Sequence, residues 1–199
     1  MHYPSFYDEV EPIVLQDKLS RFLGAFEEGI IEFSYLDSVK LAGHSCPTVA
    51  GAYLMIREGL KALYGEALPQ RGEIEVAFKE TLEEGTTGVV ANIAMQITGA
   101  TDTSGFKGLN GNFNRTHLMH FHQEINSMIK LTRTDTHKSV EISYNPASIP
   151  PNAQIQPLMA KMMQGVASSD EKHLFGILWQ ARVEEILKNP NSAIFIIFI

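Results

Sequence analysis

The feature that most constrains this chain is an apolar stripe that lies between a proline and a glycine. After Pro47, apolar residues recur at helical spacing as far as Gly65. The stripe consists of Val49, Ala52, Tyr53, Ile56, Leu60, Leu63 and Tyr64. Proline suits the first position of a helix, where its missing N–H is no loss, and glycine suits the position after the end. The pattern predicts a helix over residues 47–64, with Cys46 at or near its N-cap.

Cys46 and His44 form the strongest candidate site. Cys46 is the only cysteine in the chain, and His44 precedes it by two residues. A thiol at a helix N-terminus meets the positive end of the helix dipole and free backbone N–H groups, which favour the thiolate. Thiolate and imidazole are preferred ligands of zinc and related metals, and the same pair suits nucleophilic catalysis. The structural alternative is that the lone cysteine is inert packing.

A histidine run provides the second candidate. Residues 118–121 have the pattern of a strand, on which His120 and His122 share one face while His117 lies on the other. The first pair has a spacing able to chelate a metal, or it belongs to a solvated strand face. The face of His117 is expected to turn toward the helices, where Cys46 begins.

The whole chain has 199 residues, a net charge of -7 and a pI near 5.5, which argues against nucleic acid as a partner. No stretch reaches the length of a membrane span. The first residues lack the charged start and apolar run of a signal peptide. One cysteine permits no internal disulfide, which fits a reducing compartment. We therefore expect a cytoplasmic protein without a membrane partner.

The order of the expected elements indicates an α+β fold. A strand over 74–78 follows the helix at 47–64, and a second helix runs from the Gly85–Gly88 segment to Gly99. Three further strands are expected at 118–121, 128–132 and 140–144. Helix, strand, helix and three strands make a core of helices on a mixed sheet.

We expect one domain over residues 1–199, with its core at about 40–145. The surrounding parts are an N-terminal helix at 12–28, a C-terminal helical extension at 157–189 and an apolar tail at 193–199. The tail suits a strand buried on both faces or an oligomer contact. A methionine stripe in the extension (Met159, Met162 and Met163) is predicted to be core. The loop from Gly99 to Asn112 is long enough to carry function, for example as a lid.

The site stretch also resembles a known family. Residues 42–47, followed by residues 50–55, resemble the Gly-His-x-Cys-Pro-Gly…Gly-Tyr-Arg-Met opening of FmdE, a component of formylmethanofuran dehydrogenase. The resemblance continues through residues 97–101, similar to a Leu-Thr-Gly-Cys-Thr segment, to about Tyr144. It implies a fold similar to the C-terminal domain of glyceraldehyde-3-phosphate dehydrogenase. It also implies a homodimer, often zinc-binding, with His44 and Cys46 as its recurrent polar site.

The chain departs from that family at the second helix. The family commonly has Asp-Ala-Cys-Ala-Val-Asp there, whereas this chain has Val89 in place of the cysteine and Asn92 in place of the last aspartate. A C-terminal cysteine-rich zinc finger is also missing. A metal would therefore need another ligand, and His117 is the first choice, with His120 or His122 as alternatives.

Three hypotheses follow. The first is a divalent metal, zinc by preference, held by His44, Cys46 and His117, with an open position acting on a carbonyl or one-carbon compound. The second is a metal-free enzyme in which Cys46 is the nucleophile and His44 its base. The third is a non-enzymatic accessory or metal-delivery protein whose tail, Ile194–Ile199, docks on a partner. Whether the protein is an enzyme stays open.

Overall fold

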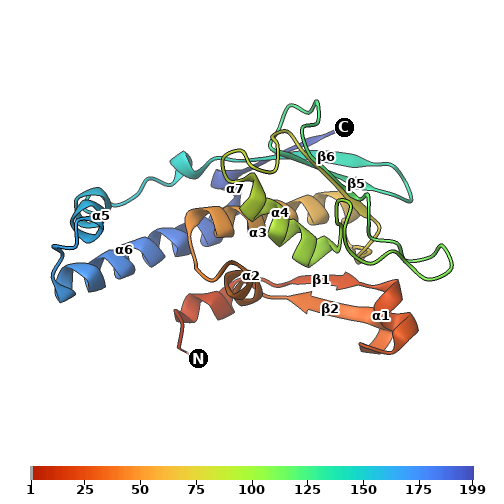
Figure 1. The fold of residues 1–199 in the computed structure, drawn as a ribbon, viewed down its shortest axis with the longest axis horizontal. Coiled ribbons are helices and arrows are strands. Elements are labelled where there is room, and N and C mark those ends of the chain that lie inside the picture. Colours follow the sequence, from red (N-terminus) through yellow and green to blue (C-terminus); the bar gives the residue numbers. More distant parts are fainter. Residues whose placement is uncertain (1) are drawn as a thin grey trace.

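The sheet at the centre of the molecule has five strands in the order β4-β3-β5-β6-β7. The computed structural model describes residues 2–199 (Figure 1). Neighbouring strands are antiparallel except for β3 and β4, which are parallel. A separate hairpin is formed by β1 and β2. The strands are β1 (Ile13–Gln16), β2 (Ile30–Phe33), β3 (Ile74–Phe78), β4 (Met119–His120), β5 (Ile129–Arg133), β6 (Ser139–Tyr144) and β7 (Ile194–Phe198).

The helices contact this sheet, pack on other helices or lie beside the hairpin. They are α1 (Lys18–Leu23), α2 (Tyr35–Ala42), α3 (Pro47–Tyr64), α4 (Thr87–Thr98), α5 (Ile155–Met163), α6 (Ser169–Lys188) and α7 (Pro190–Ala193). Short 3₁₀ turns are η1 (Ser5–Glu9), η2 (Glu27–Gly29) and η3 (Pro146–Ser148). The core order of helix, strand, helix and three strands is therefore confirmed, and the fold is α+β.

Helix α3 is the most buried element and has the predicted ends. It starts with Pro47 after the N-cap Cys46 and ends at Gly65, whose φ of 56° is left-handed. Two glycines let it approach the sheet: an added Cβ at Gly59 would lie 2.7 Å from an Ile142 methyl group, and one at Gly51 would overlap the Tyr144 ring. Close packing of this kind leaves no room for a larger side chain.

The direction of α3 along the sheet fixes where its two ends lie. The Tyr144 hydroxyl, at the end of β6, donates to the Pro47 carbonyl at 2.8 Å. At the other end of the helix, the Arg133 guanidinium lies 4.1 Å from the centroid of the Tyr64 ring. Arg133 pairs with Ile74, the first residue of β3. The N-terminus of α3 is thus at the end of the sheet where β3 finishes, and its C-terminus is where β3 begins.

The helix predicted over residues 12–28 is wrong. Ile13 and Leu15 are buried and alternate with half-exposed neighbours in β1, which pairs with β2. Asp17 then caps a new helix, because its carboxylate accepts the backbone N–H groups of Leu19 and Ser20. Gly24, with a φ of 67°, ends that helix after six residues.

The tail is a strand, as expected, but it is not buried on both faces in this chain. As β7 it pairs with β6 and forms one edge of the sheet. Ile194 is buried, whereas Phe195 and Ile197 are 51% and 55% exposed. Phe195 and Ile197 alternate with the more buried Ile194 and Ile196 and therefore share one face of the strand, which is exposed. The sequence pattern of a two-sided strand overstated the burial of that face.

The methionine stripe is not core. Met163 is 84% exposed, and Met159 and Met162 are partly buried. These residues belong to α5, which packs on α6 in an arm that extends away from the sheet (Figure 1). None of the helices among residues 2–199 combines the length and the apolar character that a bilayer crossing requires.

Candidate functional site

Cys46 occupies the N-cap of α3, as predicted. Its backbone is extended, and its Sγ accepts the backbone N–H of Val49 at 3.5 Å. Pro47 holds the first helical position, where it needs no hydrogen-bond partner. The thiol is partly buried, so it combines a fixed position with access from outside.

His44 lies beside this helix start and is exposed. Its Nδ1 is 2.9 Å from the carbonyl oxygen of Ala42. Because a carbonyl can only accept, this contact assigns the proton of a neutral ring to Nδ1 and leaves a lone pair on Nε2. Histidines that bind metals usually have this second hydrogen bond, which orients the ring.

Helix α6 holds the loop between His44 and Pro47 in place. The carbonyl oxygen of Ser45 accepts from the indole Nε1 of Trp179 at 3.0 Å and from Nε2 of Gln180 at 3.2 Å. On the other side, the hydroxyls of Ser45 and Tyr35 are 2.9 Å apart and share a hydrogen bond. Sequence reasoning did not identify these supports, because Trp179 is more than 130 positions away and nothing local connects it to the loop.

Two tyrosines beside the thiol are neutral. Burial raises the pKa of Tyr144 to about 12, with a smaller opposing effect of Arg182 and a reinforcing one of Cys46. Burial likewise raises the pKa of Tyr35 well above its ordinary value, and the Ser45 hydrogen bond opposes the rise. Both hydroxyls therefore keep their protons at neutral pH and bring no negative charge near Cys46, and that of Tyr144 donates to the Pro47 carbonyl.

The strand expected at 118–121 is shorter than predicted, and this changes the faces of the histidines. Only Met119 and His120 are in β4. His117 and His122 have left-handed φ values of 62° and 56°, so neither continues the alternation of the strand. His122 donates its backbone N–H to Glu80, and His117 donates to Asp102. The prediction that His120 and His122 share a strand face therefore fails.

His117 lies at the wrong end of the sheet to meet Cys46. Met119 pairs with Val76, which puts His117 level with Ile74 at the start of β3. Cys46 is at the opposite end of α3, whose 18 residues span about 27 Å. His117 is thus separated from Cys46 by roughly the length of this helix.

The proposed three-ligand set is consequently not assembled within one chain. Among residues 2–199, no three His, Cys, Asp or Glu side chains are grouped closely enough to hold one metal ion. The chemistry of His44 and Cys46 fits a zinc-like metal as far as two ligands.

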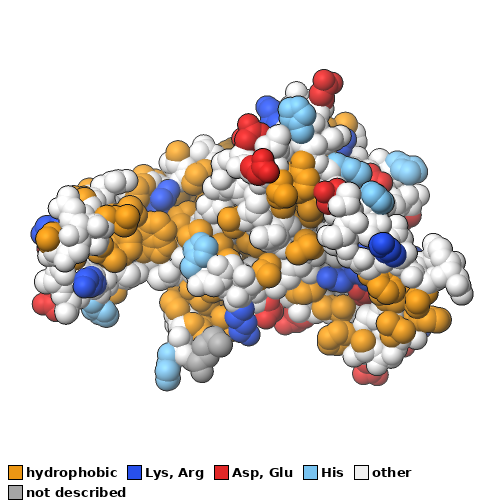
Figure 2. Space-filling view, in the orientation of Figure 1, with side chains coloured by type: hydrophobic (Ala, Val, Ile, Leu, Met, Phe, Trp, Pro, Cys, Tyr) orange, Lys and Arg blue, Asp and Glu red, His pale blue; other side chains and the backbone are white. Residues whose placement is uncertain are grey.

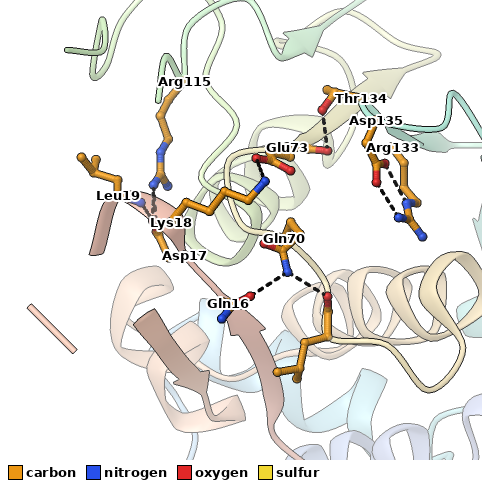
Figure 3. Close-up of polar contacts among 11 residues, drawn as sticks. Gln16, Asp17, Lys18, Leu19, Gln70, Glu73, Arg115, Arg133, Thr134 and Asp135 are labelled. Carbon is orange, nitrogen blue, oxygen red and sulfur yellow. Dashed lines mark hydrogen bonds and ion pairs between the residues drawn. The ribbon is translucent and has the colours of Figure 1, made fainter. Parts of the chain in front are cut away.

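A charged cluster that sequence reasoning missed lies at the other end of the molecule. Asp17, 2% exposed, accepts from Arg115 Nη2 at 2.7 and 2.8 Å (Figure 3). It also accepts from Arg71 Nη1 at 3.1 Å. Burial by itself would raise the pKa of Asp17, but the hydrogen bonds from Arg115, the Ser20 N–H and Arg71 outweigh it and lower the pKa. The local signal was the capping residue Asp17, and the arginines gave none.

No curated protein matches the chain. A solved structure, that of a tungsten formylmethanofuran dehydrogenase FmdE-like protein from Syntrophus aciditrophicus, is 14% identical, with a TM-score of 0.46 over 84% of this chain and 72% of that one. The family model described as FmdE, molybdenum formylmethanofuran dehydrogenase operon, matches residues 41–196. The chain therefore belongs to the FmdE family.

Proposed function

We propose that this FmdE-family protein binds a divalent transition metal, zinc by preference, through Cys46 and His44. The observation that carries the proposal is the geometry of these two side chains at the N-terminus of α3. The thiol is held at the N-cap by the Val49 N–H, and His44 has its Nδ1 on a backbone carbonyl, which leaves Nε2 free. A thiol and an oriented imidazole are ligands of this metal class.

The other ligands would come from water, substrate or a second copy of the chain. When bound, such a metal supplies Lewis-acid chemistry suited to a carbonyl or one-carbon compound. The residues of the chain itself would bind the metal and hold its ligands in position. Ser45, held by Trp179 and Gln180, fixes the loop, and the neutral Tyr144 hydroxyl fixes the first turn of α3.

Elemental analysis of the untagged protein tests the proposal. We expect about one metal ion per chain in the wild type and a loss of most of it in Cys46→Ser and His44→Ala, because a two-residue site does not survive removal of either ligand. His173→Ala, an exposed histidine on α6, is the matched control. A wild-type protein that binds no metal after incubation with zinc would contradict the proposal.

The same experiment separates His117 from the site. The sequence favoured His117 as third ligand, whereas the length of α3 separates it from Cys46. Full metal content in His117→Ala is therefore expected. A loss as large as that of Cys46→Ser would mean that His117 of a second copy reaches the site, and light scattering with and without metal would then show metal-dependent dimers. The homodimer itself stays a prediction.

A metal-free thiol enzyme is the second candidate, and the same N-cap geometry favours it. Here Cys46 would attack an electrophilic carbon while Nε2 of His44 accepts the thiol proton. This candidate predicts rapid alkylation of Cys46 by iodoacetamide below pH 7, slowed by His44→Ala. An ordinary thiol profile, unchanged by that substitution, would count against it.

A further inference from the structure

The cluster of Asp17, Arg71 and Arg115 has a net positive charge, because two guanidinium groups share a single carboxylate. Arg115 and Asp17 are 7% and 2% exposed, and Arg71 is partly buried. Lys18 and Glu73, which lie beside the cluster, pair with each other at 2.6 Å and so add no net charge (Figure 3). A buried charge without a counterion is unfavourable unless a ligand or solvent compensates it.

The cluster also has hydrogen-bond donors to spare. Arg71 uses Nε, Nη1 and Nη2 on Ile97, Asp17 and Gln96. Arg115 uses only Nη2, and across residues 2–199 its Nε and Nη1 meet no acceptor. The hydroxyl of Ser20, which is 8% exposed, is buried and likewise without a partner in this part of the chain. Buried polar groups are normally satisfied, so the Ser20 hydroxyl points to a missing partner. The two unused nitrogens of Arg115 are not fully buried and can donate to the same partner.

A cleft of about 510 Å³ opens beside these groups. Its polar floor contains Asp17, Ser20, Arg71 and Arg115, and its walls are apolar. The wall residues are Leu19, Leu23, Phe26, Ile31, Met95 and Phe106. Figure 2 shows apolar side chains gathered over the α1 end of the hairpin, next to basic ones. We term this feature the Arg115 cleft.

Several of the apolar wall residues are exposed to solvent. Leu23 and Phe26 are 62% and 54% exposed, and Phe106 is 39% exposed. They come from two distant segments, the α1 end and the loop after α4, which converge at the cleft. Apolar side chains beside a few convergent polar groups are a typical lining of a small-molecule site.

We propose that the Arg115 cleft binds a small organic carboxylate with an apolar body. The acid group takes the free donors of Arg115, with Ser20 beside it, and the body lies against Leu23, Phe26 and Phe106. A monoanion fits better than a phosphate ester because the cluster has a single uncompensated positive charge. The cleft is at the C-terminal end of α4, since Arg71 caps Gln96 and Ile97 there, and so at the opposite end of α3 from Cys46.

Calorimetric titration with phenylacetate tests the charge. Phenylacetamide has the same shape without the charge, and acetate has the charge without the body. We expect phenylacetate to bind at least tenfold more tightly than either. Equal binding of phenylacetate and phenylacetamide would overturn the role of Arg115, and tighter binding of phenyl phosphate would overturn the choice of a monoanion.

Substitutions in the exposed wall test whether phenylacetate binds in the Arg115 cleft. Phe26→Ala removes an exposed ring from the wall. We expect it to lower the affinity for phenylacetate about fivefold or more, because the contact with the apolar part of the ligand is lost. Phe195→Ala, an equally exposed phenylalanine (51%) on β7, is the control and should leave the affinity unchanged. An unchanged affinity in Phe26→Ala would overturn the proposal that phenylacetate binds in the cleft. Because these probes do not involve Cys46, Cys46→Ser should bind phenylacetate as the wild type does whether or not the metal proposal holds.

Discussion

The guanidinium group of Arg115 lies directly against the α-carbon of Gly99, the residue that ends α4. A Cβ on Gly99 would overlap Arg115 Nη1 and would lie 3.1 Å from Arg71 Nη1. Gly99 also has a left-handed φ of 75°. The Thr-Gly step that resembles an FmdE motif thus has a physical role in this chain, because it lets two arginines pass beside the end of a helix.

Replacing Gly99 by alanine should therefore destabilise the protein more than a helix-ending glycine alone explains. Gly43 is a matched control, because it ends α2 with a φ of 74° and has open space where a Cβ would be. We expect Gly43→Ala to cost about 1–2 kcal/mol, the left-handed penalty, and Gly99→Ala about 1–3 kcal/mol more from crowding. Chemical denaturation of both variants measures the difference, and equal losses would refute the crowding.

Asp17→Asn should be one of the most damaging single changes in the chain. It leaves two arginines without their carboxylate at a site where Asp17 is 2% exposed, and breaking one partner of a buried ion cluster typically costs about 3–5 kcal/mol. Because the folded-state pKa of Asp17 is lowered, its contribution is complete above the unfolded value of about 3.9 and is lost as pH falls through the lower folded value. The difference in the free energy of unfolding between wild type and Asp17→Asn should thus shrink below about pH 4.

A surface aspartate provides the control for that prediction. Asp135 also pairs with an arginine, Arg133, at 2.6 Å, but its side chain is 45% exposed. The Arg133 hydrogen bonds lower the pKa of Asp135 to about 2, yet solvent screening limits the value of an exposed pair to about 1 kcal/mol at most. Urea denaturation at pH 7 should therefore separate Asp17→Asn clearly from Asp135→Asn. Similar losses would mean that burial of the Asp17 cluster is unimportant.

The parts of the fold that could be predicted are those with local signals. Helix α3 follows from a proline, a glycine and a stripe between them, and Cys46 at its N-cap follows from the position of Pro47. The region 12–28 was misread because four residues of alternation in β1 also fit a helical period. Pairing with β2, which no local pattern encodes, decided the outcome.

The candidate site was predicted in its local part and missed in its distant part. His44 and Cys46 are two positions apart and adjoin one helix start. By contrast, Asp17 and Arg115 are 98 positions apart, and each alone looks like an ordinary surface residue. His117 was misplaced because its left-handed backbone ends the strand pattern, and nothing in the run of histidines announces that conformation.

The exposed edge of β7 should limit solubility. The strand has no charged residue, its outer edge is unpaired among residues 2–199, and Ile197 is 55% exposed. Exposed apolar edge strands favour association with other chains, and a lysine on such an edge opposes it. Ile197→Lys should raise the protein concentration at which light scattering first detects association, without loss of folding stability. Unchanged association would show that another surface is responsible.

Trp179 should report on events at Cys46. It is the only tryptophan of the chain, and its indole N–H donates to the carbonyl of Ser45, the residue before the thiol. A ligand, metal or alkylating group that moves the loop changes the length of this hydrogen bond. The emission of Trp179 should therefore shift on zinc addition or on alkylation of Cys46. Phenylacetate, which we place at the opposite end of α3, should leave the emission unchanged. Gln180→Ala removes the second hydrogen bond to the Ser45 carbonyl. It should enlarge the response, because Trp179 is then the only residue of α6 described here that donates to that carbonyl. An emission that ignores Cys46 alkylation would show that the loop is held too rigidly to respond.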